Sequence, residues 1–420
     1  MPEKFIIKGG KPLKGEIEAR GAKNAVFPIL AATLLTDEKC EIDNIPLIED
    51  VFLVVNLLKE LGKKVKWVGP RKIAVSGKTL PEKNIKNGSM GKLRGSVVFF
   101  GPLLARFKKI KMPQPGGCLI GTRPISTHLD AFSQMGAEVK PEGRNFKVSL
   151  GSEPKKTVIL NEISPTSTEN ILLLSSGLPQ ETTIKIADCD YAVQDLVKFL
   201  NKMGAIIKTA GPHIYSVQGK KKLNGAHHKI IYDPIEAGTF ILMAIAARGE
   251  VLVKNVEIPF LELTIKRLRD FGASLEVKDN TVQIKRWTVL KMDKIQALPY
   301  PGIPTDLLPL FGLLATQTEG TTLLHEPLYE GRLRYLGELN KMGAQIIFAD
   351  PHRAIINGPT LLQGIEVESP DLRGGASLIA GAVIAKGRTV INNVYQIDRG
   401  YEKIEERLQK LGVDIKRVRS

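Results

Sequence analysis

The sequence predicts an α/β protein of two domains, built from six repeats of about 70 residues with three repeats in each domain. Three observations lead to this prediction. A glycine recurs after an amphipathic stretch, a short alternating stretch follows each glycine, and a more apolar stretch precedes each amphipathic one. Six such repeats account for all 420 residues, so the repeat describes the whole chain.

The recurring glycine marks the end of an amphipathic helix in each repeat. Glycine adopts the left-handed conformation beyond a helix C-terminus without a side-chain clash. The residues after it, such as 137–140 and 273–277, alternate as in a half-exposed strand. Spacings of 74, 68, 68, 71 and 69 residues argue against six unrelated helix ends; the glycines are Gly62, Gly136, Gly204, Gly272, Gly343 and Gly412.

A second, more apolar helix is expected upstream in each repeat. Runs such as 26–35 and 239–247 are apolar around the whole helix circumference, and such helices are buried. Their N-termini carry free N–H groups that bind phosphate or carboxylate, although the polar residues there can equally serve as simple caps. The charged residues at these openings are Lys23, Arg94, Asp306 and Arg373.

Composition narrows the class of protein. With 43% apolar and 25% charged residues, the chain is typical of globular proteins and is neither disordered nor collagen-like. No apolar run is long enough to cross a bilayer, no secretory signal is visible, and three cysteines make no disulfide framework, so we expect a cytoplasmic protein without a membrane partner. The net charge of +16 suggests an anionic partner, but only 6% aromatic residues and scattered lysines disfavour nucleic acid.

The sharpest local signal is a loop at residues 113–124. Three glycines and three prolines in this stretch exclude a helix or a central strand. It carries Cys118, with Arg123 five residues later, and nearby cations favour a reactive thiolate. The alternative is an inert buried cysteine, which is our interpretation of Cys40 and Cys189. We favour a functional Cys118 because its loop carries few other chemical groups.

Three arginines occupy matching places in the last two repeats. Arg332, Arg373 and Arg399 offer forked guanidinium groups that suit carboxylate and phosphate. The segments 330–332 and 396–401 can alternatively be surface turns with local salt bridges. No zinc spacing, Walker loop or dinucleotide motif is present, and His128 has no evident partners for a hydrolytic triad. We therefore expect a small, doubly anionic substrate.

With these motifs in hand, the chain resembles the enolpyruvyl transferase family over its full length, and within it the enzymes that act on UDP-N-acetylglucosamine. The most specific matches are 21–25 (Gly-Ala-Lys-Asn-Ala), 115–118 with 123–124, 304–306 (Pro-Thr-Asp) and 397–401 (Ile-Asp-Arg-Gly-Tyr). The resemblance implies a pair of inside-out α/β barrels that close over the substrates. It implies domains of 22–231 and of 1–21 plus 232–420.

The resemblance also implies the reaction. The enolpyruvyl group of phosphoenolpyruvate passes to the 3′-hydroxyl of UDP-N-acetylglucosamine by addition and elimination with release of phosphate, the first committed step of peptidoglycan precursor synthesis. Cys118 would be the acid on phosphoenolpyruvate and can form a covalent adduct with it, while Asp306 would be the base on the hydroxyl. No metal and no organic cofactor are implied.

Further site residues follow from the same resemblance. They divide by the part of the substrates that they would meet. Lys23, Arg123 and Arg399 would hold phosphate; Arg332 and Arg373 would hold the carboxylate or close the cleft; Asn24 and Arg94 would meet the sugar and the intermediate; Ser164 and Thr166 would meet the nucleotide-sugar phosphates; and Pro124, Ile125 and Leu328 would complete the substrate-binding set.

Departures from the family pattern fall on the nucleotide-sugar side. Ser126 stands where the family usually has aspartate, and Gly331 replaces the asparagine of a Glu-Asn-Arg run. The others are at Pro165, Thr166 and Ala192. Two alternatives therefore stay open: an enolpyruvyl transferase with a different acceptor, and a non-catalytic nucleotide-sugar-binding protein on the same scaffold.

Overall fold

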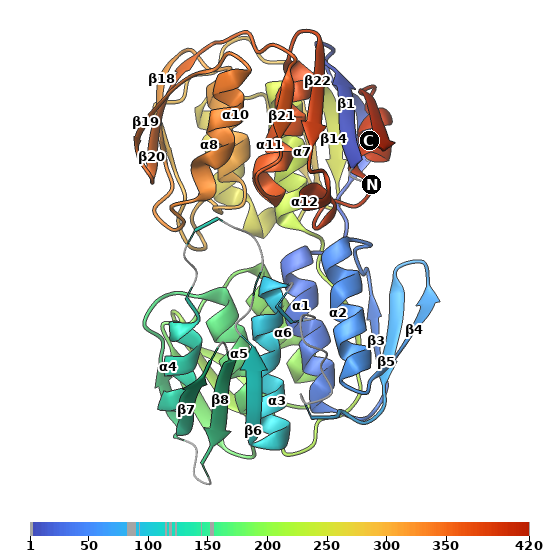
Figure 1. The fold of residues 1–420 in the computed structure, drawn as a ribbon, viewed down its shortest axis with the longest axis vertical. Helices are drawn as coiled ribbons and strands as arrows, with labels where there is room; N and C mark the ends of the chain where they lie inside the picture. The colour runs from blue at the N-terminus through green and yellow to red at the C-terminus, as the bar shows by residue number, and fades with distance from the viewer. Residues whose placement is uncertain are drawn as a thin grey trace. The chain divides into compact units, whose positions relative to one another are not determined.

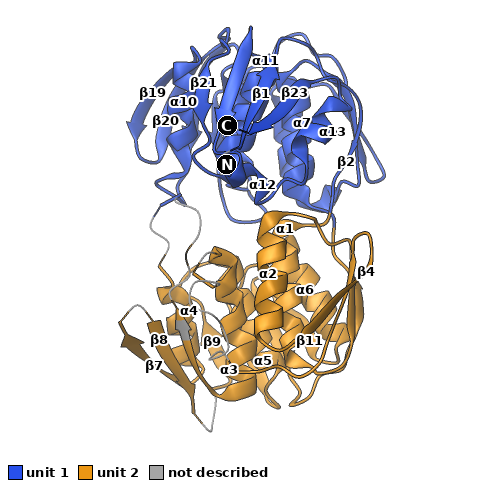
Figure 2. Cartoon of the chain, turned by 45° about the vertical axis from the view of Figure 1, so that its right-hand side comes forward, with its two compact units in different colours: residues 1–20, 118–122, 232–420 blue, residues 21–117, 123–231 orange. Residues whose placement is uncertain are grey.

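The computed structural model describes residues 3–81, 90–91, 93–113, 116, 120–121, 124–143, 145–151 and 155–419. By its internal contacts the chain divides into two compact units (Figure 2). Among the described residues, unit 1 holds 3–20, 120–121 and 232–419, and unit 2 holds 21–116 and 124–231 with the gaps given above. Unit 1 therefore contains both chain ends.

Unit 2 is a mixed α/β unit with three sheets among its described residues (Figure 1). Their strand orders are β13-β3-β5-β4, β6-β8-β7 and β11-β12-β10-β9. The elements are α1 (Lys23–Ala32), η1 (Thr33–Leu35), β3 (Cys40–Asp43), α2 (Glu49–Glu60), β4 (Lys64–Gly69), β5 (Lys72–Ser76), η3 (Arg94–Phe99), α3 (Phe100–Phe107), β6 (Lys109–Pro113), α4 (Ser126–Gln134), β7 (Ala137–Glu142), β8 (Asn145–Leu150), β9 (Thr157–Ile159), α5 (Pro165–Ser176), β10 (Glu181–Lys185), α6 (Tyr191–Lys202), β11 (Ile206–Gly211), β12 (Ile214–Gln218) and β13 (His227–Lys229).

Unit 1 also has three sheets, two of which recruit strands from the start of the chain. Their orders are β21-β22-β1-β23, β15-β16-β14-β2 and β17-β18-β20-β19. The elements are β1 (Glu3–Lys8), β2 (Lys14–Glu18), α7 (Pro234–Ala246), β14 (Glu250–Lys254), η4 (Ile258–Phe260), α8 (Glu262–Asp270), β15 (Leu275–Lys278), β16 (Thr281–Ile284), β17 (Lys294–Gln296), α9 (Leu308–Ala315), β18 (Gly320–His325), η5 (Arg332–Arg334), α10 (Tyr335–Lys341), β19 (Gln345–Asp350), β20 (Arg353–Gly358), β21 (Glu366–Glu368), α11 (Leu372–Ile384), β22 (Arg388–Asn392), α12 (Tyr395–Asp398), α13 (Ile404–Gln409) and β23 (Asp414–Arg419).

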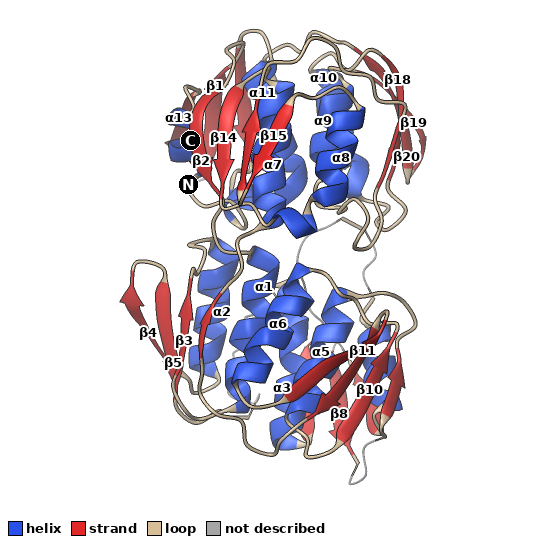
Figure 3. Ribbon diagram, turned by 180° about the vertical axis from the view of Figure 1, so that it is seen from behind, coloured by secondary structure: helices blue, strands red, loops and turns tan. Residues whose placement is uncertain are grey.

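Helices fill the centre of each unit and the sheets lie outside them (Figure 3). The central helices are apolar on all sides, as burial requires. Every residue of α7 and of α9 is buried, and so are the last ten residues of α5. This arrangement buries the predicted apolar helices and leaves their N-terminal turns to carry polar groups.

The amphipathic helices end as the sequence predicts. Each is followed by a glycine with φ between +86° and +104°, a region that glycine enters without strain. The chain then turns into a strand, as from α2 through Gly62 to β4. The predicted left-handed conformation is confirmed at Gly62, Gly136, Gly204, Gly272, Gly343 and Gly412.

Across the described part of the chain, no helix has both the length and the apolar character needed to cross a membrane.

Candidate active site

In unit 1, two buried arginines hold Asp306, which lies just before α9. Asp306 Oδ1 accepts a hydrogen bond from Arg332 Nη2 at 2.9 Å. Asp306 Oδ2 lies 2.9 Å from Arg373 Nη2 and accepts from Arg373 Nε at 3.1 Å. The arginine side chains are 4% and 2% exposed, against 21% for the aspartate. The structure thus joins three predicted site residues, and the carboxylate is the most accessible of them.

The Arg373 guanidinium group is fixed by further bonds within the unit. Its Nη1 donates to the Tyr401 hydroxyl at 3.1 Å, and that hydroxyl lies 2.9 Å from Thr239 Oγ1. Asp371 caps α11 by accepting from the backbone N–H groups of Arg373 and the next residue. The orientation of Arg373 is therefore set by both its backbone and its side chain.

Arg332 is buried at the start of η5. The alternative in which 330–332 form a surface turn is therefore wrong for this residue. Burial alone would lower the pKa of its guanidinium group, but the charges of Asp306, Asp371 and a further carboxylate outweigh burial, so the pKa is raised. The group keeps its positive charge in an apolar environment because acids surround it.

Arg399 follows α12 in the same unit and is buried. Its Nη1 donates to Gln396 Oε1 at 3.2 Å. The preceding residue, Asp398, accepts two hydrogen bonds from Arg417 of β23, at 2.7 and 2.8 Å. Arg417 also donates to Glu405 at 2.6 Å. The last strand of the chain therefore anchors the segment that presents Arg399.

Part of the glycine-rich loop packs on the segment that leads to Arg332. The Gly331 N–H donates to the Ile120 carbonyl at 2.9 Å. A Cβ on Gly331 would come within 2.6 Å of the Ile120 carbonyl carbon, and one on Gly121 within 2.5 Å of the Glu330 carboxylate. Contact this close requires glycine, which explains why asparagine does not fit at 331 in this chain.

Two predicted site residues, Cys118 and Arg123, lie outside the described residues. Leu328 is described and is 39% exposed. Its backbone N–H donates to Glu326 at 2.9 Å. The predicted roles of Cys118 and Arg123 therefore stay predictions.

In unit 2, Lys23 and Asn24 form the first turn of α1. Lys23 Nζ lies 3.0 Å from the buried Asp50 carboxylate and 4.9 Å from the centre of the Phe27 ring. Asn24 Nδ2 donates to the Tyr191 hydroxyl at 3.0 Å. Both predicted residues are thus anchored by side chains of other helices, since Asp50 belongs to α2 and Tyr191 begins α6.

A second group in unit 2 gathers around the start of α4. Arg94, the first residue of η3, donates to the Pro124 carbonyl at 3.2 Å. Ile125 is buried, and its carbonyl accepts hydrogen bonds from the backbone N–H groups of His128 and Leu129 in α4. Ser164 caps α5 with its side chain. Arg94 and Pro124 are therefore brought together. The N-terminal turns of α4 and α5 are also in contact, because His128 of α4 lies 3.2 Å from Thr166 of α5.

His128 is linked to both Asn170 and Thr166. Asn170 Oδ1 accepts from the Gly101 N–H at 2.7 Å and its Nδ2 donates to the Val97 carbonyl at 2.9 Å, which fixes the amide orientation. The same Nδ2 lies 3.0 Å from His128 Nδ1 and must donate to it. His128 Nε2 lies 3.2 Å from Thr166 Oγ1.

The protonation of His128 decides what Thr166 can do. Burial, with a smaller contribution from Arg94, lowers the pKa of His128 to about 3, so the ring is neutral at pH 7. With Nδ1 accepting, the single ring proton is on Nε2 and is donated to Thr166 Oγ1. The threonine hydroxyl proton is then directed to another acceptor. Sequence reasoning missed this role, because it tested His128 only as a triad member.

Two buried acids, Glu169 and Asp188, and the half-buried Asp190 lie where α5 meets the start of α6, and sequence reasoning missed this cluster. Burial is the main cause that raises the pKa of Asp188, Asp190 and Glu169. Repulsion by Asp188 adds to it for Asp190, and repulsion by both aspartates adds to it for Glu169. The pKa of Asp190 is raised to about 7. A glutamate inside the apolar run of α5 was the available sequence signal. Cys189, between the two aspartates, is half-buried, so the prediction that it is buried was wrong.

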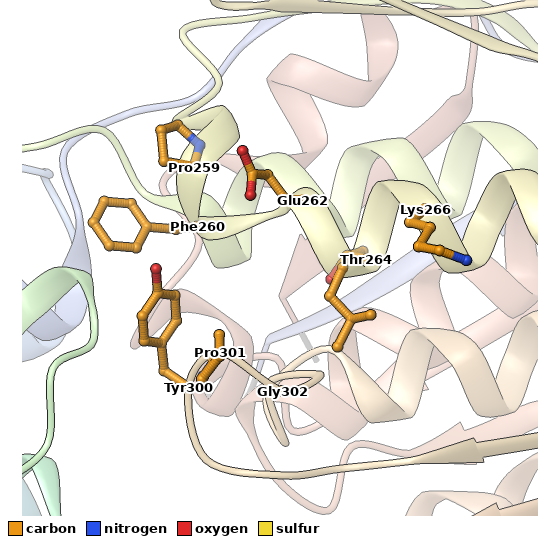
Figure 4. Close-up of a pocket in the computed structure, with 9 residues that line it drawn as sticks. Pro259, Phe260, Glu262, Thr264, Lys266, Tyr300, Pro301 and Gly302 are labelled. Atoms are coloured by element: carbon orange, nitrogen blue, oxygen red, sulfur yellow. The ribbon is translucent and has the colours of Figure 1, made fainter. Parts of the chain in front are cut away.

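Figure 4 shows a pocket of about 490 Å³ beside α8. Phe260 and Tyr300 line it with ring centroids 5.6 Å apart. Its lysine, Lys266, pairs with Asp270 at 2.7 Å. Tyr300 belongs to the segment that leads to Asp306, but the pocket holds no cluster of charges comparable with the one around that residue. Among the described residues, no group of histidine, cysteine and acid side chains is arranged to hold a metal ion.

Comparisons with known proteins identify the family to which the chain belongs. The model of the family described as EPSP synthase (3-phosphoshikimate 1-carboxyvinyltransferase) matches residues 7–408. The chain therefore belongs to this family of carboxyvinyltransferases.

Two curated relatives are more specific. The UDP-N-acetylglucosamine 1-carboxyvinyltransferase of Treponema denticola is 39% identical, with 98% of each chain covered. UDP-N-acetylglucosamine 1-carboxyvinyltransferase 3 of Caldanaerobacter subterraneus subsp. tengcongensis is 38% identical, with 99% of this chain and all of that one covered.

Solved structures show the same fold. The enolpyruvyl transferase NikO from Streptomyces tendae superposes with a TM-score of 0.91 at 22% identity, covering 100% of this chain and 99% of the other. An EPSP synthase from Acinetobacter baumannii gives 0.76 at 18% identity, with both chains fully covered. At these identities the likeness concerns the fold, which is the two-domain α/β fold of enolpyruvyl transferases.

Proposed function

We propose that the chain transfers the enolpyruvyl group of phosphoenolpyruvate to the 3′-hydroxyl of UDP-N-acetylglucosamine and releases phosphate. The observation that carries this proposal is the Asp306 cluster, in which one accessible carboxylate lies between two buried guanidinium groups. Such a cluster offers a base for a hydroxyl and cations for an anionic substrate. The full-length similarity to enzymes named for this reaction supports it.

The chemistry assigns a role to each group. Asp306 takes the proton of the hydroxyl, whose oxygen bonds to C2 of phosphoenolpyruvate, while Cys118 protonates the methylene carbon. The resulting tetrahedral ketal then loses a proton from the new methyl group, and phosphate leaves as the double bond re-forms. Arg332 and Arg373 neutralise the substrate carboxylate during both steps.

The remaining predicted residues bind the rest of the substrates. Lys23, Arg123 and Arg399 hold the phosphate that leaves, and Asn24 with Arg94 meets the sugar and the intermediate. Ser164 and Thr166 meet the phosphates of the nucleotide sugar. His128 donates to the Thr166 hydroxyl, which leaves the hydroxyl proton free to be donated to a phosphate. Pro124, Ile125 and Leu328 complete this side.

We extend the proposal to the architecture. Among the described residues, three of the six sheets consist of strands from one stretch of about 70 residues, and the other three each add one strand from a distant part of the chain, namely β1, β2 or β13. In this proposal each sheet belongs to one repeat, and three repeats make one functional domain. The functional domains are 22–231 and 1–21 plus 232–420, the second of which takes in the first two strands of the chain. Both domains supply residues to the reaction.

The test is phosphate release from phosphoenolpyruvate, with and without UDP-N-acetylglucosamine, in the full chain and in Cys118→Ala. We expect release only with the nucleotide sugar, and a rate at least about 100-fold lower in the variant, as for loss of a general acid. Absence of release under either condition would contradict the proposal and favour a binding protein.

A second candidate is the same reaction on a different acceptor. It is favoured by Thr166, one of the departures from the family pattern, whose hydroxyl lies 3.2 Å from His128 Nε2. The same assay with other UDP-sugars decides: release that requires another sugar would keep the chemistry and replace the acceptor.

A further inference from the structure

One buried carboxylate near Asp306 has no part in the mechanism above. Glu326 directly follows β18 and has no exposed surface. Burial raises the pKa of its carboxyl group, while bonds from Thr305 and the Leu328 backbone and the charge of Arg332 act in the opposite direction. A buried carboxylate lowers the stability of the fold unless its oxygens accept hydrogen bonds or pair with a cation.

Both oxygens of Glu326 accept hydrogen bonds from segments that carry site residues. The Thr305 hydroxyl donates to Oε2, and Thr305 is the residue immediately before Asp306. The Leu328 N–H donates to Oε1 at 2.9 Å, in the segment that leads to Arg332. The side chain therefore ties together the two segments whose ends form the Asp306–Arg332 ion pair.

The backbone of Glu326 is fixed as well. Its N–H donates to the His352 carbonyl at 2.7 Å, and its carbonyl lies 2.7 Å from His352 Nδ1. The carboxylate thus projects from the end of a strand, and residues of two connections outside the helices and strands, 303–307 and 327–331, donate hydrogen bonds to it. An amide cannot replace it without change, because both partners are donors and a glutamine nitrogen would face one of them.

We propose that Glu326 is a positioning residue, which holds the Thr305–Asp306 turn and the 327–332 segment in the register that presents the Asp306 carboxylate to the substrate hydroxyl. This inference rests on the proposed function. Glu326 touches no reacting atom itself. It acts through Thr305 on one side and through Leu328 on the other.

The experiment compares three variants in the full chain with one matched control. Glu326→Gln and Thr305→Val each remove a bond of the carboxylate, and Thr305→Ser keeps the hydroxyl. Glu236→Gln is the control, because Glu236 is also a buried glutamate of unit 1, bound to Arg407 at 3.2 Å. Each protein is assayed for kcat, for KM of phosphoenolpyruvate and for the midpoint of thermal unfolding.

We expect kcat to fall about tenfold or more in Glu326→Gln and Thr305→Val, as for loss of a hydrogen bond to a charged group, with KM for phosphoenolpyruvate within about twofold. Thr305→Ser should restore most of the activity. Glu236→Gln should lower the unfolding midpoint and leave kcat unchanged. Variants that lose stability like the control but keep kcat would overturn the inference and leave Glu326 a structural residue.

Backbone hydrogen exchange gives a readout that needs no turnover. Glu326→Gln should speed exchange in both 304–308 and 327–333, whereas the control should leave both segments unchanged. Unchanged exchange in either segment would overturn the inference. If the unaltered protein released no phosphate, the proposed function would fail, and the exchange result alone would decide whether Glu326 ties the two segments.

Discussion

In unit 1, charge holds the candidate site residues, whereas in unit 2 most of them are held by neutral hydrogen bonds. Asp306 sits between two guanidinium groups that are almost fully buried. Thr166 is held by a neutral imidazole, and Asn24 by a phenol hydroxyl. The pair of Lys23 with Asp50 is an exception, because it is an ion pair in unit 2.

The difference matters because buried charges and neutral groups respond differently to change. Removing one partner of a buried ion pair leaves an uncompensated charge, which is costly, while a lost neutral bond costs about 1 kcal/mol. The charged site of unit 1 is therefore rigid but intolerant of substitution. The neutral bonds of unit 2 orient donors without a large electrostatic penalty, so substitutions there should alter affinity more than stability.

The largest effect is expected for Asp306→Ala. The variant leaves Arg332 and Arg373 buried without their common carboxylate, and we expect a loss of about 3 kcal/mol in the free energy of unfolding together with loss of activity. Urea unfolding measures the first quantity. Glu276→Ala, which removes the exposed pair with Lys285, is the control and should leave stability nearly unchanged. Equal losses in the two variants would show that burial of the arginines is not what matters.

Unit 2 has its own exception in Asp190, and the expected effect there has the opposite sign. The pKa of Asp190 is raised to about 7 by burial and by Asp188, so the folded state keeps a proton that the unfolded state gives up above about pH 4. This contribution to stability is full below the unfolded pKa and is lost as the pH rises towards 7. Asp190→Asn should therefore stabilise the chain by roughly 2 kcal/mol at pH 7.5 and hardly at all at pH 4.

The asparagine can still cap α6, where Asp190 accepts two backbone N–H bonds at 2.9 Å. Urea midpoints at pH 4, 5.5 and 7.5 measure the effect. Asp195→Asn is a useful contrast, because Asp195 is buried but bonded to His228 at 3.0 Å, and its loss should destabilise. If Asp190→Asn gave the same gain at pH 4 as at pH 7.5, the raised pKa would be disproved as its cause.

The sequence was most informative where local rules act. Glycine spacing located the ends of the amphipathic helices, since a left-handed residue after a helix is decided within a few residues of chain. The motif resemblance predicted Asp306, Arg332 and Arg373 as site residues, and in the structure both arginines donate hydrogen bonds to the aspartate.

Contacts between distant segments could not be predicted in the same way. Glu326 and Thr305 are 21 residues apart, and His128 and Asn170 are 42 apart. Nothing in the local pattern tells which buried acid meets which hydroxyl. Gly331 shows the same limit, because its need for glycine comes from Ile120, which reaches it only in the fold. The roles of Cys118 and Arg123 stay predictions.

A smaller effect is expected at Thr166, which tests the neutral hydrogen bonds of unit 2. Thr166→Val keeps the shape but removes the hydroxyl that His128 orients. If that hydroxyl donates to a phosphate, KM for the nucleotide sugar should rise about tenfold, with KM for phosphoenolpyruvate unchanged. Thr166→Ser should behave like the unaltered chain. Equal kinetics for the valine and serine variants would show that the hydroxyl makes no such bond.

The smallest effect is expected for Tyr191→Phe, which removes the hydroxyl that accepts from the Asn24 amide. The ring stays packed, so the unfolding midpoint should change little, while freedom gained by Asn24 should raise KM for the nucleotide sugar about threefold, as for one neutral hydrogen bond. Tyr215→Phe is the matched control, because Tyr215 is equally buried in unit 2 and is no site residue. In the double variant Asn24→Ala/Tyr191→Phe, two residues that share one hydrogen bond should change KM by less than the two single changes combined. Fully additive changes would disprove the link.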